Sequence, residues 1–294
     1  MTVLPSDDAL EEMRPRRGSA MLGTLRRYPL ACAGGFVLLL LVLAALFAPW
    51  LWTVDPLILS PARRLRPPSA QYWFGTDQLG RDIYSRVIYG SRVSMIVGFG
   101  VATIATTVGL LVGLLTGFNR VADAFLSRVM DGLMAIPSVL LAIAIMALTR
   151  ASVEGVIAAI TVAEIPRVAR LVRSVVLSLR EQPFIEAARA IGTTRVKILW
   201  RHILPNTAGP LMVQASYICA SAILIEATLS FLGAGAPAEI PSWGNIMAEG
   251  RALFQIAPSI IFFPAVFLSL AVLSVNLLGD GLRDALDPRL SRRL

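Results

Sequence analysis

The stretch Glu186-Ala187-Ala188-Arg189-Ala190-Ile191-Gly192 interrupts a chain that is otherwise largely apolar. It is polar and helix-prone, and it lies between hydrophobic segments that are each long enough to cross a bilayer. Glu186 falls in the first turn after Pro183, where the helix dipole favours an anion. Gly192 can adopt the left-handed conformation that ends a helix, and Pro205 should stop the helix that follows. The pattern predicts a short helix presented to a soluble partner, and the alternative is an amphipathic helix lying on the membrane.

The composition places the chain among polytopic membrane proteins. It has 294 residues, of which 56% are hydrophobic, and its mean hydropathy is +0.70. The net charge of +8 comes from arginines that flank apolar segments, a pattern of membrane topology rather than of nucleic-acid binding. Cys32 and Cys219 lie in apolar runs and His202 is the only histidine, so we expect no disulfide framework, metal site or cofactor.

The single lysine excludes the common nucleotide-binding loop. Lys197 follows Val196, whereas the motif GxxxxGK[ST] requires a glycine at that position. If ATP drives this protein, another polypeptide must bind the ATP and its magnesium ion. The sequence also contains no recognisable catalytic constellation, so we expect a protein that is not an enzyme on its own and has no catalytic residues.

Six apolar runs have about the length that a bilayer requires. We therefore expect an all-α polytopic membrane protein with six transmembrane helices. The second run is rich in glycine, which lets helices pack closely in lipid, and Pro137 should bend the third. The runs are residues 28–52, 92–118, 129–149, 153–172, 206–232 and 258–278.

We divide the chain into five sections, the fourth of which contains the last five apolar runs. Lysine and arginine are more numerous in the sections that would face inward, so the positive-inside rule places both termini in the cytoplasm. Arginines of the first external loop, such as Arg63 and Arg64, oppose this assignment but are outnumbered. The sections are a cytoplasmic tail (1–27), a first transmembrane helix (28–52), an external loop with an amphipathic helix (53–91), a transmembrane core (92–281) containing a coupling loop (173–205), and a second cytoplasmic tail (282–294).

Three regions outside the coupling loop carry candidate polar contacts. In the external loop, Asp77 can cap a helix, and Asp82 and Arg86 are spaced for an i, i+4 ion pair. In the last external loop, Trp243 and Asn245 are candidates for contact with an external docking protein, and Trp243 would equally suit an interface anchor. We also expect Asp131, near the inner end of the third run, to pair with an inner arginine.

Polar residues inside the apolar runs are candidates for the transport pathway or its gate. A carboxylate at membrane depth is costly and faces protein or water. Glu164 either lines the pathway or pairs with Arg167 or Arg170, and the ion pair is the favoured choice. Glu226 either lines the pathway or makes a structural hydrogen bond to a neighbouring helix, and Asn276 is the third candidate.

Several of these motifs resemble one family. Glu186-Ala187-Ala188, the glycine at 192 and Leu204-Pro205 resemble the EAA loop of ABC importer permeases. The motif at 74–86, the stretch from 226 to 233 and parts of the last loop and tail resemble the C-type subunit of the dipeptide, oligopeptide and nickel branch. Two residues depart from the branch pattern: His202 replaces a usual apolar residue, and Glu164 stands near a position where an aromatic is commoner.

The resemblance implies a type I ABC importer permease fold in a bacterial cytoplasmic membrane. It implies that the loop docks into a groove on a separate ATPase through Glu186, Ala187, Ala188, Ile191 and Gly192. The implied partners are a homologous permease subunit, giving a heterodimer, two ATPase subunits that bind ATP and magnesium, an external solute-binding protein, the lipid bilayer and a peptide substrate, with no nucleic acid.

Two other classes stay open as alternatives. A secondary transporter or channel would work without an ATPase, and it would more often show inverted repeats or paired intramembrane charges. A membrane-embedded hydrolase would need a nucleophile with a base, or metal ligands, and His202 alone is a poor candidate.

Overall fold

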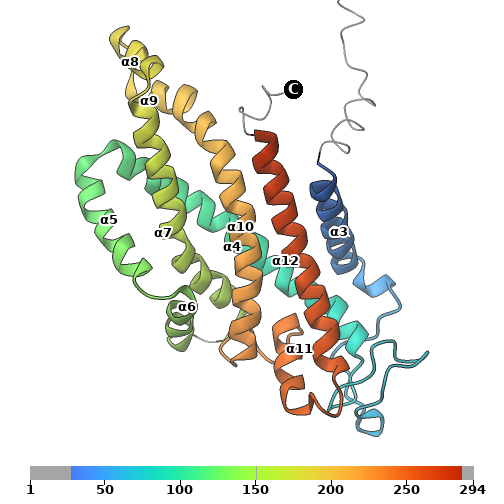
Figure 1. The fold of residues 1–294 in the computed structure, drawn as a ribbon. Helices are drawn as coiled ribbons and strands as arrows, with labels where there is room; N and C mark the ends of the chain where they lie inside the picture. The colour runs from blue at the N-terminus through green and yellow to red at the C-terminus, as the bar shows by residue number, and fades with distance from the viewer. Residues whose placement is uncertain (1–27, 150, 287–294) are drawn as a thin grey trace, which may run out of the picture.

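The computed structural model describes residues 28–149 and 151–286. The predicted tail at 1–27 lies outside the described residues, as does the part of the second tail from 287 onward. Within the described ranges every regular element is a helix, so the predicted all-α fold is confirmed. The long helices are α3 (Pro29–Leu46), α4 (Ile83–Phe118), α7 (Val153–Arg180), α10 (Leu204–Phe231) and α12 (Ser259–Leu286). In Figure 1, α4 runs obliquely behind α7, α10 and α12.

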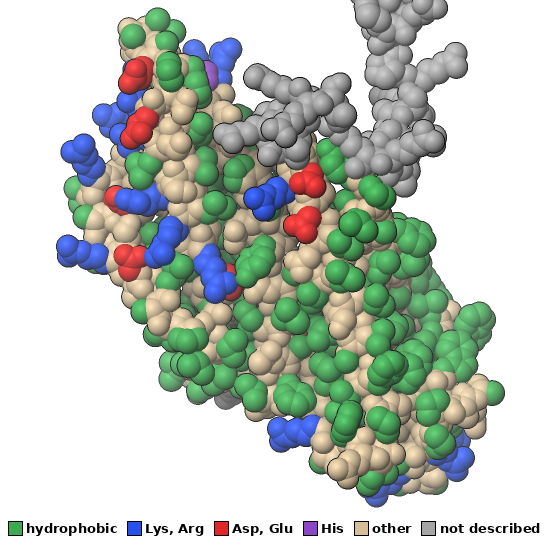
Figure 2. Space-filling model, in the orientation of Figure 1, with side chains coloured by type: hydrophobic (Ala, Val, Ile, Leu, Met, Phe, Trp, Pro, Cys, Tyr) green, Lys and Arg blue, Asp and Glu red, His purple; other side chains and the backbone are tan. Residues whose placement is uncertain are grey.

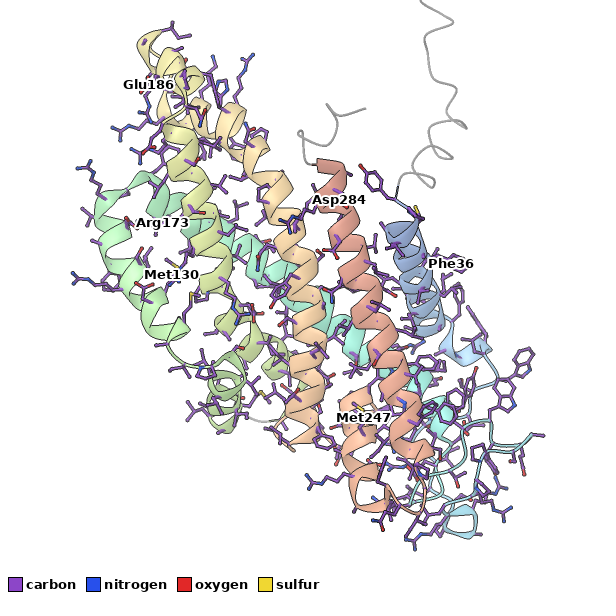
Figure 3. All side chains as sticks on the ribbon, in the orientation of Figure 1. Phe36, Met130, Arg173, Glu186, Met247 and Asp284 are labelled. Atoms are coloured by element: carbon purple, nitrogen blue, oxygen red, sulfur yellow. The ribbon has the colours of Figure 1, made fainter. Side chains whose placement is uncertain are left out.

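Shorter helices join the long ones at the two ends of the bundle. One end carries α8 and is called the coupling end; the opposite end, called the loop end, carries residues 47–82 and α11 (Figure 1). Figure 3 places Glu186 at the coupling end and Met247 at the loop end. The short helices are α5 (Arg120–Met134), α6 (Ser138–Ala147), α8 (Pro183–Ala190), α9 (Arg195–Ile198) and α11 (Trp243–Gly250).

Among the described residues, four helical segments are long and apolar enough to cross a membrane. They are α3, α4, the segment Arg195–Phe231 and α12, and the pair of α5 and α6 makes a fifth if its two bent halves count as one span. Helix α7 has 28 residues, which is about 42 Å of helix. It carries charged residues such as Glu164 and Arg167, which keep it out of the apolar class. The predicted number of six therefore depends on α7 and on the bent pair.

Two predicted boundaries are corrected. Helix α4 begins at Ile83 and runs without a break to Phe118, so the amphipathic helix predicted in the external loop is the first part of α4. The third span was predicted at 129–149 with a bend at Pro137; the bend is present, but it separates two helices at an angle of 92°, and the first of them already begins at Arg120. Pro137 lies immediately before α6, where the residue is in an extended conformation, because proline cannot continue the helix of α5.

Glycines explain the close contact of α4 with α7. Gly109, Gly113 and Gly117 recur every four residues, and a Cβ added at each would lie 2.4–2.6 Å from Val168, Val172 and Val176 respectively. The matching spacing puts one row of glycines on α4 against one row of valines on α7. Small residues on such an interface let two backbones approach closely in lipid.

The charged side chains are divided between the two ends. Figure 2 shows a mostly hydrophobic surface between them, with Lys, Arg, Asp and Glu gathered near the coupling end and further basic residues at the loop end. The start of α3 and the end of α12 both lie toward the coupling end (Figure 1), and the hydroxyl of Tyr28 donates to the backbone oxygen of Asp284 at 3.4 Å. The bundle thus has a hydrophobic band that suits a bilayer between two polar ends.

Candidate coupling site

Helix α8 follows α7 after a two-residue break at Glu181 and Gln182. Pro183 occupies the first turn, where its missing N–H leaves no hydrogen bond unmade. Glu186 also lies in the first turn, as predicted. The helix stands at the far tip of the coupling end, beyond the hydrophobic band of the bundle (Figures 1 and 3).

Gly192 ends α8 in the way the sequence predicted. Its φ is +80°, a conformation that L side chains rarely adopt. The N–H of Thr193 donates to the oxygen of Ala188 at 3.0 Å, and the N–H of Gly192 donates to Arg189 at 2.9 Å, which is the hydrogen-bond pattern of a glycine-terminated helix. A Cβ at Gly192 would meet nothing within 4 Å. The requirement for glycine therefore comes from backbone conformation and not from space.

The predicted coupling residues face two ways. Glu186 and Ala187 are exposed, and Ile191 is 82% exposed. Ala188 instead packs inward beside the fully buried Ile185, as part of the main hydrophobic cluster. The structure therefore gives Ala188 a packing position beneath the exposed face of α8.

Further apolar side chains are exposed at the same tip, and two of them, Val196 and Trp200, were not predicted from the sequence. Trp200 is 66% exposed, and Val196 and Phe184 are also exposed. The sequence signal that could have indicated them is the presence of large apolar residues in a polar loop. We call Phe184, Ile191, Val196 and Trp200 the apolar tip. Exposed apolar groups of this kind mark interaction sites more often than random surface.

Pro205 does not stop a helix, contrary to prediction. The segment Leu199–Ile203 is a π-helical turn that leads from α9 directly into α10, and Pro205 lies in the first turn of α10. The N–H of Leu204 donates to the oxygen of Leu199, five residues back. Because the π turn is wider than an α turn, the helix passes the proline without a break. His202 lies in this turn, with its ring 6.0 Å from that of Phe184.

Ion pairs tie α5 to α7 below the tip. Arg173 donates from Nε and Nη2 to the two carboxylate oxygens of Asp123 at 2.5 and 2.8 Å. Arg170 donates to Asp131 at 2.5 Å, which confirms that Asp131 pairs with an arginine. Together they fix α5 along the α7 helix that leads into α8.

The predicted pathway residues lie apart from one another. Glu164 is fully buried, and Arg167 Nη1 contacts its two oxygens at 3.1 and 3.2 Å, so the favoured ion pair is confirmed. Glu226 is also fully buried and accepts from Ser94 of α4 at 3.1 Å and from Ser230 at 2.9 Å, which is the structural hydrogen bond to a neighbouring helix. Asn276 is exposed on α12.

An apolar cavity of about 390 Å³ opens among α3, α4, α10 and α12. Glu164, Glu226 and Asn276 are absent from its lining. The cavity thus gives no support to these three as pathway residues. Its lining residues are Leu38, Phe99, Ala102, Thr103, Thr106, Met212, Ala215, Ser216, Cys219, Val275, Leu278 and Leu282.

At the loop end, four charged side chains form a buried cluster. Arg81 Nε donates to Asp77 at 2.6 Å, and Arg86 Nη1 donates to Asp77 at 2.7 Å and to Glu249 at 2.6 Å. Arg81 also contacts Glu249. Two positive and two negative charges balance there, and Asp77 and Arg86 are almost fully buried. The cluster fastens the external loop to α11.

This cluster corrects two predictions. Arg86 pairs with Asp77 and Glu249 and not with Asp82. Asp82 is instead the N-cap of α4, because its carboxylate accepts from the N–H of Ser85 at 2.8 Å. Asp77 caps no helix; its Oδ1 accepts from the N–H groups of Leu79 and Arg81 in a turn.

The predicted external docking residues are buried. Trp243 is fully buried, and its Nε1 donates to the backbone oxygen of Val87 at 3.1 Å. Asn245 Nδ2 donates to the oxygens of Pro237 and Ile240, each at 3.0 Å. Both side chains hold α11 and its loop in place, so neither is available to an external protein or to lipid.

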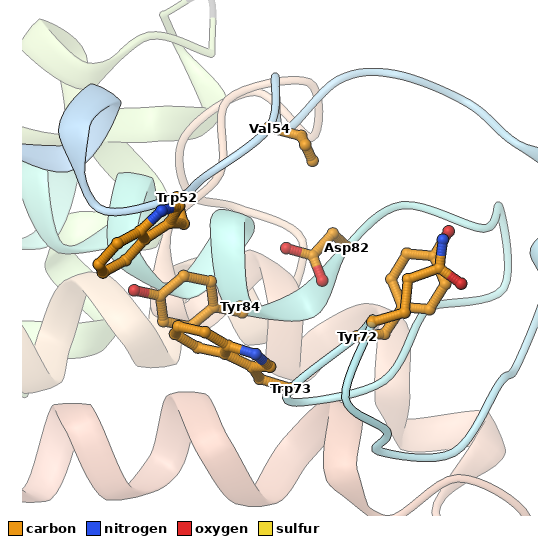
Figure 4. A pocket seen from close by; sticks show the side chains of 7 residues that line it. Trp52, Val54, Tyr72, Trp73, Asp82 and Tyr84 are labelled. Atoms are coloured by element: carbon orange, nitrogen blue, oxygen red, sulfur yellow. The ribbon is translucent and has the colours of Figure 1, made fainter.

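A pocket of about 330 Å³ lies in the external loop. Figure 4 shows aromatic side chains around Asp82: Trp52, Tyr72, Trp73 and Tyr84. The hydroxyl of Tyr84 donates to the oxygen of Leu51 at 3.0 Å. Exposed tryptophans at the end of a hydrophobic band are typical of a membrane–water interface.

Comparison with known proteins then decides the family. Residues 105–292 match the family described as the binding-protein-dependent transport system inner membrane component. The chain belongs to this family. Residues 19–68 separately match the N-terminal transmembrane domain of oligopeptide transport permease C. This permease is therefore a membrane subunit of an ABC importer, and the second match agrees with the resemblance of its motifs to the C-type subunit.

Relatives of this permease align over nearly the whole chain. It is 55% identical to the probable peptide ABC transporter permease protein y4tQ of Sinorhizobium fredii, over 91% of this chain and 92% of the relative. It is 42% identical to the dipeptide transport system permease protein DppC of Alkalihalophilus pseudofirmus, over 97% and 94%. It is 45% identical to the glutathione transport system permease protein GsiD of Salmonella typhimurium, over 90% and 88%.

A solved structure shares the fold of this permease. A chain from the inward-facing MetNI methionine ABC transporter aligns with a TM-score of 0.58 and 22% identity, covering 69% of this chain and 96% of that one. The predicted type I ABC importer permease fold is thus confirmed. The alternatives of a secondary transporter, a channel or a hydrolase receive no support from any of these similarities.

Proposed function

We propose that this subunit forms half of a peptide pathway and takes up force from separate ATPase subunits through α8 and the apolar tip. The single observation that carries this proposal is the exposure of Ile191 and Trp200 at the end of a firmly packed helix pair. Large apolar side chains in a water-exposed helix tip are unfavourable unless a partner covers them.

Buried apolar side chains beneath α8 would hold it as a rigid element. Ile185 and Ala188 anchor the helix in the main hydrophobic cluster, to which Ile198 and Ile203 also belong, while α7 is fixed to α4 by the glycine–valine contact. A push on α8 would therefore reach the spans through packed side chains and not through a mobile loop. ATP and magnesium would be bound by the partner ATPases.

The ATPase contact is tested by placing a charge in the apolar tip. Ile191→Asp should reduce the ATPase that co-purifies with the permease, because the carboxylate would be desolvated in the contact. Val121→Asp is the matched control, since Val121 is 80% exposed at the start of α5, outside the tip. Equal ATPase recovery from both variants, at equal permease levels, would refute the contact.

The proposed cargo is a peptide, delivered by an external solute-binding protein, with a homologous permease as the second half of the pathway. The relatives named for peptides, dipeptides and glutathione support this class of cargo. Cells that carry the complete transporter should take up labelled dipeptide, and unlabelled dipeptide, but not free amino acid, should compete. Uptake of free amino acids alone would contradict the peptide assignment.

The proposed orientation places the coupling end and both termini in the cytoplasm of a bacterial cell. The arginines near α8 support it through the positive-inside rule. A cysteine placed at Gln182 should resist an impermeant thiol reagent in intact cells and react after lysis. A cysteine placed at Leu57 in the external loop should react in intact cells. The reverse pattern would overturn the orientation.

A further inference from the structure

A cavity of about 710 Å³ lies between the end of α4, the end of α7 and the α8–α9 loop. Four arginines line it, and its lining contains no carboxylate. In Figure 2, basic side chains gather at this end of the molecule. The lining residues are Phe118, Asn119, Arg120, Arg180, Arg189, Thr193, Arg195 and Ile198.

No carboxylate in the described ranges balances the charges in this cavity. Five other arginines of the described ranges form ion pairs, including Arg167, Arg170 and Arg173 on α7. None of the four cavity arginines forms an ion pair with a described carboxylate. Arg180 donates to the backbone oxygen of Gly117 at 2.6 Å and lies over the Phe118 ring, so it is held in place with its charge unneutralised. Four like charges around one cavity repel each other until an anion enters.

We propose that this cavity binds the phosphate group of an anionic phospholipid. Arginine matches phosphate oxygens with two parallel hydrogen bonds, and basic pockets between helices on the cytoplasmic side suit anionic headgroups. The start of α5 adds little, because the side chain of Asn119 already accepts from the N–H groups of Val121 and Ala122. The arginines therefore carry the site.

A lipid fits better than a free phosphate because the cavity continues into an apolar surface. Phe118 and Ile198 form an apolar part of its wall. Leu115 and Leu111 lie on α4 about one and two turns before Phe118, and both are exposed. Residues at this spacing share one face of a helix. An acyl chain can lie along this face while the headgroup reaches the arginines.

A lipid in this place would join the transport core to the coupling loop. Arg120 begins α5 and Arg180 ends the long helix α7, whereas Arg189 lies on α8 and Arg195 begins α9. One phosphate held by both groups would restrain the loop relative to the spans. This inference does not depend on the ATPase contact, because the cavity is formed by this chain alone.

The test uses the full-length chain, with any subunits that accompany it, in nanodiscs of phosphatidylcholine mixed with phosphatidylglycerol. Mass spectrometry after a detergent wash measures the phosphatidylglycerol that stays bound. The variant Arg120→Gln/Arg195→Gln should retain about tenfold less than the natural chain. The matched control Arg128→Gln/Arg201→Gln removes two exposed charges from the same end without touching the cavity lining, and it should retain lipid normally.

A second arm separates the two sources of phosphate. In nanodiscs of phosphatidylcholine alone, added inorganic phosphate should leave the melting temperature unchanged, whereas phosphatidylglycerol in the disc should raise it. Stabilisation by inorganic phosphate to the same extent would overturn the lipid assignment. Equal lipid retention by both double variants would overturn the site. Loss of ATPase from the cavity variant with lipid retention intact would assign the arginines to the ATPase contact instead.

Discussion

The two ends of this permease differ in how far their charged and large side chains are buried. At the loop end, Asp77, Arg81, Arg86 and Glu249 are buried against one another, and Trp243 and Asn245 are enclosed as well. At the coupling end, Ile191 and Trp200 extend into solvent, and four arginines surround a cavity whose lining holds no carboxylate. One end satisfies its groups with other described residues, whereas at the other end the groups are available to the partners proposed above.

The difference shows that a transmembrane subunit can fix its loops with buried ion pairs at one end and keep side chains accessible at the other. The loop-end cluster joins segments more than 160 positions apart, since Arg86 and Glu249 are separated by 163 residues. The contacts at the coupling end join residues that are closer in sequence, since Asp123 and Arg173 are separated by 50 residues and Arg180 and Gly117 by 63. Three experiments can break or sharpen this comparison.

The largest effect should come from Arg86→Ala. It removes a guanidinium that contacts both Asp77 and Glu249, and Asp77 stays fully buried with Arg81 as its remaining partner. Breaking a buried ion pair by removing one member costs about 3–5 kcal/mol. The purified subunit should therefore unfold at a markedly lower temperature in detergent. Arg64→Ala, which removes an exposed arginine from the same loop, should change the unfolding temperature little. Similar melting temperatures for both variants would mean that the loop end is not fastened by this cluster.

A smaller, local effect is expected at Gly192. Its φ of +80° costs an L residue about 1–2 kcal/mol, and a β-branched residue suffers most. Gly192→Val should leave the subunit assembled at natural levels but lower uptake per ATP hydrolysed, because α8 would end at a different angle. Asparagine tolerates the left-handed region, so Gly192→Asn should be milder.

Gly132 offers a matched control for Gly192. A Cβ at either glycine meets nothing within 4 Å, but Gly132 lies inside α5 with an ordinary helical backbone. Gly132→Val should keep normal coupling, measured as transport per ATP in proteoliposomes. If both valine variants couple normally, the shape of the helix end has no role in transmission.

The sequence predicted those features that depend on neighbouring residues. The end of α8 at Gly192 and the Glu164–Arg167 contact both follow from short-range spacing, and both are present. The family motifs supplied the overall architecture. The same local reasoning gave the wrong ion-pair partner for Arg86, because its partner Glu249 is remote in sequence. It also gave the wrong exposure for Trp243, because a tryptophan near an interface can face either lipid or protein. Pro205 was misjudged because a π turn, which relieves the proline, has no simple sequence signal.

The smallest effect on stability is expected for the Asp123–Arg173 pair. Its size tests whether this part of the coupling end stays exposed to solvent in the complete transporter. Both side chains are about a third exposed or less, and two hydrogen bonds join them. A double-mutant cycle with Asp123→Asn and Arg173→Gln should give a coupling energy of about 0.2–1 kcal/mol in the isolated subunit. The more exposed Asp131–Arg170 pair, treated in the same way, should give less. Because lower solvent access strengthens charge interactions, the Asp123–Arg173 energy should rise when the complete transporter is measured if a partner covers α5. An unchanged energy would place α5 at a surface that stays exposed after assembly, and would confine the partner contact to the tip of α8.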